Sequence, residues 1–108
     1  MTTEELIAQF SDLATDMCVK MQAKNNDYAG KRDPLKNLRK HGVYGITIRM
    51  DDKLCRLDSF FNPAEAVERK VKDESVDDTL MDLATYALLA IILRRDEERS
   101  SAPREAAL

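Results

Sequence analysis

Residues 80–93, Leu-Met-Asp-Leu-Ala-Thr-Tyr-Ala-Leu-Leu-Ala-Ile-Ile-Leu, decide the fold class of this chain. Twelve of these 14 residues are apolar, and they cover the whole circumference of a helical wheel. The stretch contains Asp82 and is shorter than the roughly 20 apolar residues that cross a membrane, so we predict no membrane span. A helix that is apolar on every side is expected at the centre of a bundle or in an interface between subunits.

The composition of the whole chain agrees with a helical protein. Its 108 residues include only 3 Gly and 3 Pro, whereas 44% are hydrophobic and 34% are charged. We predict one all-α domain over residues 1–94, a bundle of four to five helices, followed by a polar, flexible tail over residues 95–108. Because so short a chain hardly buries a helix that is apolar all round, oligomerisation into a homodimer or homotetramer is expected to complete the core.

The first helix is marked by a capping box, in which Thr2 is followed three residues later by Glu5. We expect this helix to end near Lys24, because residues 25–30 are rich in the Asn, Asp and Gly that form loops. Its apolar residues recur at three- and four-residue steps and are expected in the core. They are Leu6, Phe10, Leu13, Met17 and Met21.

Turn and capping residues divide the rest of the chain into further helices. The predicted bounds are Asp33 to Gly42, Gly45 to Asn62, Pro63 to about Lys70, and Asp73 or Ser75 to about Arg94. The helix that follows Gly45 has apolar residues at helical spacing, which predicts a buried stripe. That stripe is formed by Met50, Leu54, Leu57 and Phe61.

The two cysteines, Cys18 and Cys55, stand far apart and form no CxxC pair. This spacing indicates neither a zinc site nor a disulfide framework. We interpret both as small core residues of a protein in the reducing cytoplasm.

Positive charge is concentrated in one part of the chain. Residues 20–49 carry 8 basic and 2 acidic residues, whereas the remainder carries 9 basic and 18 acidic ones. A basic segment of this kind either is a solvated face or attracts an anionic ligand such as a phosphate. Sequence-specific DNA binding is not expected, because the whole chain is acidic and contains no recognised nucleic-acid motif.

A row of acids leads into the apolar stretch. Glu74, Asp78 and Asp82 recur every four residues, which places their carboxylates along one side of a helix. Neighbouring carboxylates repel one another unless a cation lies among them. One solution is Mg²⁺, or Mn²⁺, because hard divalent ions prefer carboxylate oxygens. The other solution is a salt bridge or a cap-like hydrogen bond from Asp82 to Lys53, Arg56 or Tyr28.

Three basic residues follow one edge of the helix predicted from Gly45 to Asn62. Arg49, Lys53 and Arg56, at steps of four and three, either neutralise the acids directly or hold the phosphates of a ligand that a metal bridges to them. Tyr28, beside the basic segment, either packs on the core or stacks on a base. Together the acids and bases predict a site for a metal-chelated, phosphorylated small molecule.

Four segments of the chain resemble a phage and bacterial family called nucleotide modification associated domain 1. They are residues 24–28, 33–38, 49–57 and 73–87, and the likeness covers roughly residues 20–93. The most specific motif is E-x-x-x-D-T-L-x-D-L-A-x-Y-A, from Glu74 to Ala87. The resemblance implies a nucleotide context and marks Asp27 and Asn37 as further nucleotide-binding candidates.

The chain is more distantly similar to the MazG-like and dimeric dUTPase group of all-α nucleoside triphosphate pyrophosphohydrolases. That group binds Mg²⁺ through E-x-x-E on one helix and E-x-x-D on the next, and only the second motif is present here, from Glu74 to Asp77. The likeness implies attack of a metal-activated water on a nucleoside triphosphate. Lys53 and Arg56 would then be catalytic, offsetting the developing charge, and the assembly would be a dimer or tetramer.

Two other functions stay open at this stage. The same residues suit a non-catalytic binder of a nucleotide or signalling nucleotide, and they also suit a helical protein-interaction module whose acids and bases pair internally. In each case we expect a cytoplasmic protein of a bacterial or phage-infected cell.

Overall fold

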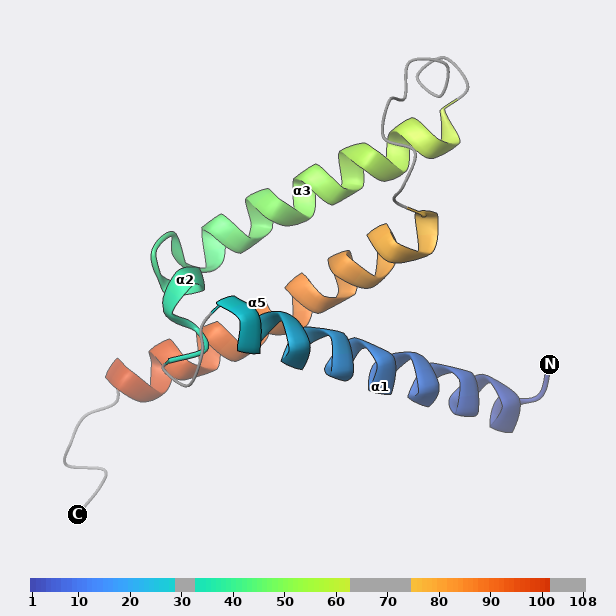
Figure 1. The fold of residues 1–108 in the computed structure, drawn as a ribbon, viewed down its shortest axis with the longest axis horizontal. Helices are drawn as coiled ribbons and strands as arrows, with labels where there is room; N and C mark the ends of the chain where they lie inside the picture. Colours follow the sequence, from blue (N-terminus) through green and yellow to red (C-terminus); the bar gives the residue numbers. More distant parts are fainter. Residues whose placement is uncertain (29–32, 63–74, 102–108) are drawn as a thin grey trace. The chain divides into compact units, whose positions relative to one another are not determined.

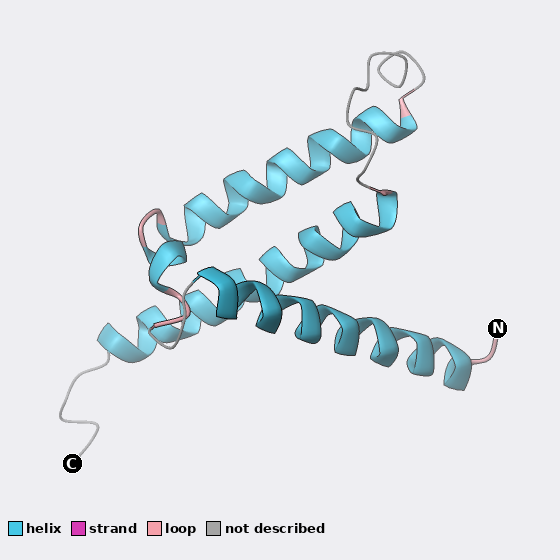
Figure 2. Ribbon diagram, viewed as in Figure 1, coloured by secondary structure: helices cyan, strands magenta, loops and turns pink. Residues whose placement is uncertain are grey.

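The computed structural model of the chain describes residues 1–28, 33–62 and 75–101, with the backbone alone for residues 25–28. Every regular element in these residues is an α-helix, which confirms the all-α prediction for the described part of the chain (Figure 2). The number of helices in a bundle stays a prediction, since the helix expected over residues 63–70 lies outside the described residues. The helices are α1 (Thr3–Tyr28), α2 (Lys36–Arg39), α3 (Gly42–Phe61) and α5 (Val76–Ser101) (Figure 1).

The chain forms two compact units, residues 1–37 and residues 38–108. The N-terminal unit contains α1, and the C-terminal unit contains α3 and α5, while the boundary falls inside the single turn of α2. Among the described helices, none combines the length and the apolar character that a membrane span requires.

The predicted capping box starts α1. The backbone N–H of Thr2 donates to the Glu5 carboxylate at 2.9 Å, and the N–H of Glu5 donates to the Thr2 hydroxyl at 3.1 Å. The end predicted near Lys24 is wrong, because α1 continues to Tyr28. Asn and Asp cost less than about 0.7 kcal/mol each in a helix, and the first strong helix breaker after Lys24 is Gly30.

Two expectations about buried residues in this helix and in α3 are also wrong. Leu6, Phe10 and Leu13 of the α1 stripe are exposed, and 73% of the Phe10 surface is accessible to solvent. Cys18 and Cys55, interpreted as core residues, are both exposed free thiols. The helical period places Cys18 on a flank of the α1 stripe and Cys55 on the outer side of α3, so apolar character alone did not locate them.

The connection between α2 and α3 depends on one glycine conformation. Asp33 caps the turn before α2 as predicted, since its carboxylate accepts the N–H of Leu35 at 3.1 Å. Gly42 was expected to end the short helix and Gly45 to precede the next, but α3 already begins at Gly42. Gly42 has a φ of 65°, which glycine adopts without a Cβ penalty, and this allows the chain to enter α3 three residues earlier than expected.

The C-terminal end of α3 agrees with the prediction. The helix ends at Phe61, and Asn62 is extended, with φ −91° and ψ 112°. The following Pro63 explains this conformation, because a proline disfavours helical geometry in the residue before it.

Helices α3 and α5 pack against each other and run in opposite directions (Figure 1). Ile46 of α3 and Leu93 and Thr79 of α5 are fully buried. The buried stripe predicted for α3 is partly wrong, since Leu54 is 51% exposed and Phe61 is 70% exposed. The residues of α3 that are buried or half-buried at helical spacing are Ile46, Met50, Lys53, Leu57 and Phe60.

The side of α3 that faces the core therefore includes Lys53 and Phe60, where apolar spacing alone predicted Leu54 and Phe61. A search for apolar periodicity passes over Lys53, although its long aliphatic stem can line a core while its charge meets a partner.

Helix α5 extends beyond the boundary predicted at residue 95. It is helical to Ser101, and residues 102–108 lie outside the described residues. Its start agrees with the expected Ser75, whose hydroxyl accepts the N–H of Asp78 at 3.0 Å. On the side of α5 away from Leu93, a set of apolar side chains is exposed. They are Leu80, Leu88, Ile91 and Ile92.

A substitution at Gly45 tests the α2–α3 connection. Gly45 lies inside α3, where alanine normally stabilises a helix by about 0.5–1 kcal/mol, but a Cβ at this position would overlap the Cβ of His41. We expect Gly45→Ala to lower the free energy of unfolding by about 1–2 kcal/mol, measured by urea denaturation. In a His41→Gly background the same change should be stabilising, and a stabilising effect in the native background would contradict the geometry.

Candidate functional site

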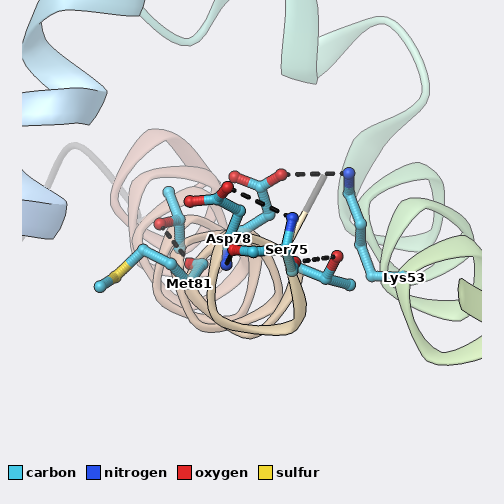
Figure 3. A network of polar contacts seen from close by, with 7 residues as sticks. Lys53, Ser75, Asp78 and Met81 are labelled. Atoms are coloured by element: carbon cyan, nitrogen blue, oxygen red, sulfur yellow. Dashed lines mark hydrogen bonds and ion pairs between the residues drawn. The ribbon is translucent and has the colours of Figure 1, made fainter. Parts of the chain in front are cut away.

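An ion pair between α3 and α5 forms the centre of the candidate site. The Lys53 Nζ lies 3.1 Å from the Asp82 Oδ2, and the two side chains are only 14% and 29% exposed (Figure 3). Asp82 belongs to the most apolar helix of the chain, where an unpaired carboxylate would be costly. Of the two solutions that the sequence left open, the structure therefore contains the one in which a basic side chain neutralises the acid.

A second ion pair joins α2 to α5. The Arg39 Nη1 lies 2.6 Å from the Asp96 Oδ2. Because Arg39 is the last residue of α2 and α3 begins at Gly42, the two pairs connect α5 to different elements of the chain.

The three basic residues predicted on α3 form a continuous strip. Arg49 and Arg56 lie within about 60° of Lys53 on the helical wheel, and the strip is about 10 Å long. Arg49 and Arg56 are exposed, whereas Lys53 is mostly buried between the helices. The strip therefore has an exposed arginine on either side of a lysine whose ammonium group is held against a carboxylate.

The three predicted metal ligands differ in how the structure places them. Asp82 pairs with Lys53, and Asp78 closes the capping box, since its carboxylate lies 3.4 Å from the N–H of Ser75 (Figure 3). Glu74 lies outside the described residues. Within those residues, no group of three or more His, Cys, Asp or Glu side chains could hold a metal ion, so the Mg²⁺ site stays a prediction.

The remaining nucleotide-binding candidates belong to the N-terminal unit. Asp27 and Tyr28 form the end of α1, where only the backbone is described, and Asn37 is exposed in α2. The strip on α3 belongs to the C-terminal unit. Among the described side chains of the predicted site, the structure thus brings Lys53 and Asp82 into contact and leaves Arg49 and Arg56 beside them.

Sequence reasoning missed the pair of Arg39 and Asp96. Asp96 fell in the region predicted to be a tail, and Arg39 was counted only as part of the basic segment. No helical spacing could have linked this pair to Lys53 and Asp82, because α2 ends at Arg39 and α3 begins at Gly42. Thr79 was missed as well, although its burial is explained by its position on the α5 face that packs on α3 and by a 3.2 Å hydrogen bond to the Ser75 carbonyl.

Comparisons of this chain with models of known protein families, with curated proteins and with solved structures give no match. The resemblance to the nucleotide modification associated family therefore stays a prediction from the quoted motifs. The function has to be argued from the residues of α3 and α5 themselves.

A double-mutant cycle measures the central ion pair. Lys53→Met keeps the aliphatic stem and Asp82→Asn keeps the shape of the acid, so the cycle isolates the charge interaction. We expect a coupling energy of about 1–2 kcal/mol in the free energy of unfolding, above that of exposed pairs because both side chains are partly buried.

Asp77 provides the matched control for this cycle. It is exposed and lies on a different side of α5 from Asp82. Combining Lys53→Met with Asp77→Asn should give additive effects within about 0.3–0.5 kcal/mol. Equal coupling in the two cycles would show that the interaction is a general effect of net charge and not a contact of Lys53 with Asp82.

Proposed function

We propose that the chain binds a nucleotide, or a closely related phosphorylated small molecule, on the face shared by α3 and α5. The observation that supports this most directly is the strip in which exposed Arg49 and Arg56 flank the Lys53–Asp82 ion pair. Guanidinium groups bind phosphate oxygens in a bidentate manner, and two arginines about 10 Å apart along the helix axis suit a ligand with several phosphates.

The ion pair gives this proposal a specific charge requirement. A phosphate that approached Lys53 alone would meet the negative charge of Asp82, and a cation that approached Asp82 alone would meet the positive charge of Lys53. A phosphate and a divalent cation that arrive together give each side chain a new partner of opposite charge. The ligand expected at this face is therefore a nucleotide in complex with Mg²⁺, or with Mn²⁺.

The reaction proposed for this complex is pyrophosphohydrolase-like cleavage of a nucleoside triphosphate. The chemistry that Mg²⁺ supplies when bound is polarisation of phosphate oxygens and activation of a water molecule. Asp78 and Asp82 lie on one side of α5 and have the carboxylate oxygens that Mg²⁺ prefers. Glu74, the third predicted ligand, lies outside the described residues. Lys53 and Arg56 would offset the negative charge that develops on the phosphates.

A second candidate is a protein that binds the nucleotide without cleaving it. The observation that favours it is that Asp78 acts as a helix cap and Asp82 as an ion-pair partner, so both described acids already have a structural role. In this case the arginines of the strip would hold the phosphates and no hydrolysis would follow.

We also propose that the chain acts as a homo-oligomer in the cytoplasm. The exposed apolar side of α5, formed by Leu80, Leu88, Ile91 and Ile92, supports association, since apolar side chains on one face of a helix favour burial. The two free cysteines support a reducing compartment.

Incubation with a panel of nucleoside triphosphates and Mg²⁺ tests the reaction. We expect a nucleoside monophosphate and pyrophosphate as products, separated by anion-exchange chromatography. Tight binding without turnover for every nucleotide would reject the hydrolase in favour of the binder. Neither binding nor turnover would reject both and leave a helical interaction module whose charges pair internally.

Variants of the strip test the residues. Because a hydrogen bond to a charged group contributes about 1.5–3 kcal/mol, Arg49→Gln and Arg56→Gln should each weaken nucleotide binding by about tenfold or more in calorimetric titrations. Arg94→Gln, at an exposed position of α5 outside the strip, should leave the affinity unchanged.

The requirement for joint binding is tested at Asp82. In the native chain, addition of Mg²⁺ should raise the affinity for the nucleotide, and in Asp82→Asn this gain should disappear while the helical circular dichroism is kept. An equal gain in both proteins would remove Asp82 from the metal site.

A further inference from the structure

Helices α3 and α5 share a face on which charged side chains gather. We call the charged face the set formed by Arg49, Lys53 and Arg56 of α3 with Asp78 and Asp82 of α5. Three bases meet two acids in this set, and a bound Mg²⁺ would add two positive charges. An excess of positive charge on one face attracts polyanions. The neutral side chains around it determine whether a ligand is recognised by its phosphates alone or also by a base.

Arg49 is a base of the charged face that is open to an anion. It is exposed, and among the residues that the structure describes its side chain has no ion-pair partner. Lys53, by contrast, is only 14% exposed and is paired with Asp82. Arg49 precedes Lys53 by about one helical turn, so phosphates bound at Arg49 can extend along α3 to the ion pair. This placement suits a linear polyanion better than a single phosphate.

The hydroxyl groups near the charged face already donate hydrogen bonds within their own helices. The Thr85 hydroxyl donates to the Met81 carbonyl at 2.8 Å, and the Ser59 hydroxyl donates to the Arg56 carbonyl at 2.7 Å. The hydroxyl of the buried Thr79 is used in the same way. Because a hydroxyl has one proton to donate, none of these three groups is a spare donor for the edge of a base.

Amide and imidazole side chains, which commonly distinguish one base from another, lie far from the centre of this face. Within residues 38–62 and 75–101 they are His41, just before α3, and Asn62, just after it. These two positions are about 18 and 14 Å from Lys53 along the helix axis. Neither residue therefore belongs to the charged face.

Aromatic rings open to solvent, on which a base could stack, lie on other sides of α3. In the described part of the C-terminal unit the exposed aromatic residues are Tyr44 and Phe61. Both lie about 120–140° around α3 from the two arginines of the charged face. Phe60 and Tyr86 are half-buried, so neither offers an open ring. Stacking is thus not expected to select a base on this face.

We propose that the charged face recognises a linear polyphosphate chain together with its Mg²⁺, and that a nucleoside is not required. This inference rests on the proposed function, because it uses the same residues, and it narrows what they recognise. Guanidinium groups bind phosphate oxygens in the same manner in inorganic polyphosphate and in a nucleotide. The ligand class is then an inorganic chain of three or more phosphates, together with the nucleoside triphosphates of every base.

Calorimetric titration of the full chain with inorganic tripolyphosphate and Mg²⁺ tests this inference against ATP, GTP, CTP and UTP. We expect the four nucleotides to agree in dissociation constant within about tenfold, since one hydrogen bond to a base contributes about that factor. Tripolyphosphate should bind at least as tightly as the nucleotides, within the same factor. A larger preference for one base, or for nucleotides over tripolyphosphate, would overturn the inference.

The same titrations separate the inference from the proposed function. Binding of nucleotides without binding of tripolyphosphate would keep the proposed function and overturn the inference. Binding of tripolyphosphate without nucleotides would reject the nucleotide and support recognition of the phosphate chain. Absence of binding for both ligands would overturn both proposals.

Arg49→Gln tests whether tripolyphosphate binds at the charged face. Glutamine and arginine have similar helix propensities, so the helical circular dichroism should be kept. We expect the affinities for tripolyphosphate and for nucleotides to fall by the same factor, about tenfold or more. Arg94→Gln removes an equal charge at an exposed position of α5 outside this face and should change neither affinity. An unchanged tripolyphosphate affinity in Arg49→Gln, or equal losses in the two variants, would overturn the inference.

Discussion

A carboxylate in the most apolar helix of the chain is the constraint on which the C-terminal unit depends. Asp82 lies in residues 80–93, of which 12 of 14 are apolar, and it pairs with Lys53 across the interface. This contact determines which side of α3 faces α5, and it selects a stripe that includes a lysine over one made only of apolar residues. A second ion pair, between Arg39 and Asp96, holds the end of α2 against α5.

The parts of the fold that sequence predicted well are those with a local chemical cause. The Thr2 capping box and the Ser75 start of α5 depend on side chains within one turn, and the end of α3 depends on the residue before a proline. The errors concern elements whose limits have a weak local cause. The Asn and Asp residues after Lys24 lower helix propensity too little to end α1. The polar residues after Arg94 continue α5, because their helix propensity is favourable and because Asp96 pairs with Arg39.

In the candidate site, too, the features with a local cause were predicted and those that depend on contacts between helices were not. Spacing along one helix was sufficient to place Arg49, Lys53 and Arg56 on one strip and to place Asp78 and Asp82 on one side of α5. Which acid pairs with which base depends on how α3 and α5 are placed against each other, and this placement cannot be predicted from a single sequence. The sequence therefore left metal binding and ion pairing open for Asp82, and the structure adds the ion pair without removing the need for a test with metal and nucleotide together.

The two ion pairs limit how α5 can vary in evolution, because both of their acids belong to this helix. Insertion of one residue between Asp82 and Asp96 would rotate Asp96 by about 100° around α5 and remove it from Arg39, even if all the charged residues were kept. Apolar residues between the two acids can exchange more freely, since volume and polarity are what packing requires there. Diverged homologues would then be recognised less by overall identity than by a conserved distance between the two acids of this helix.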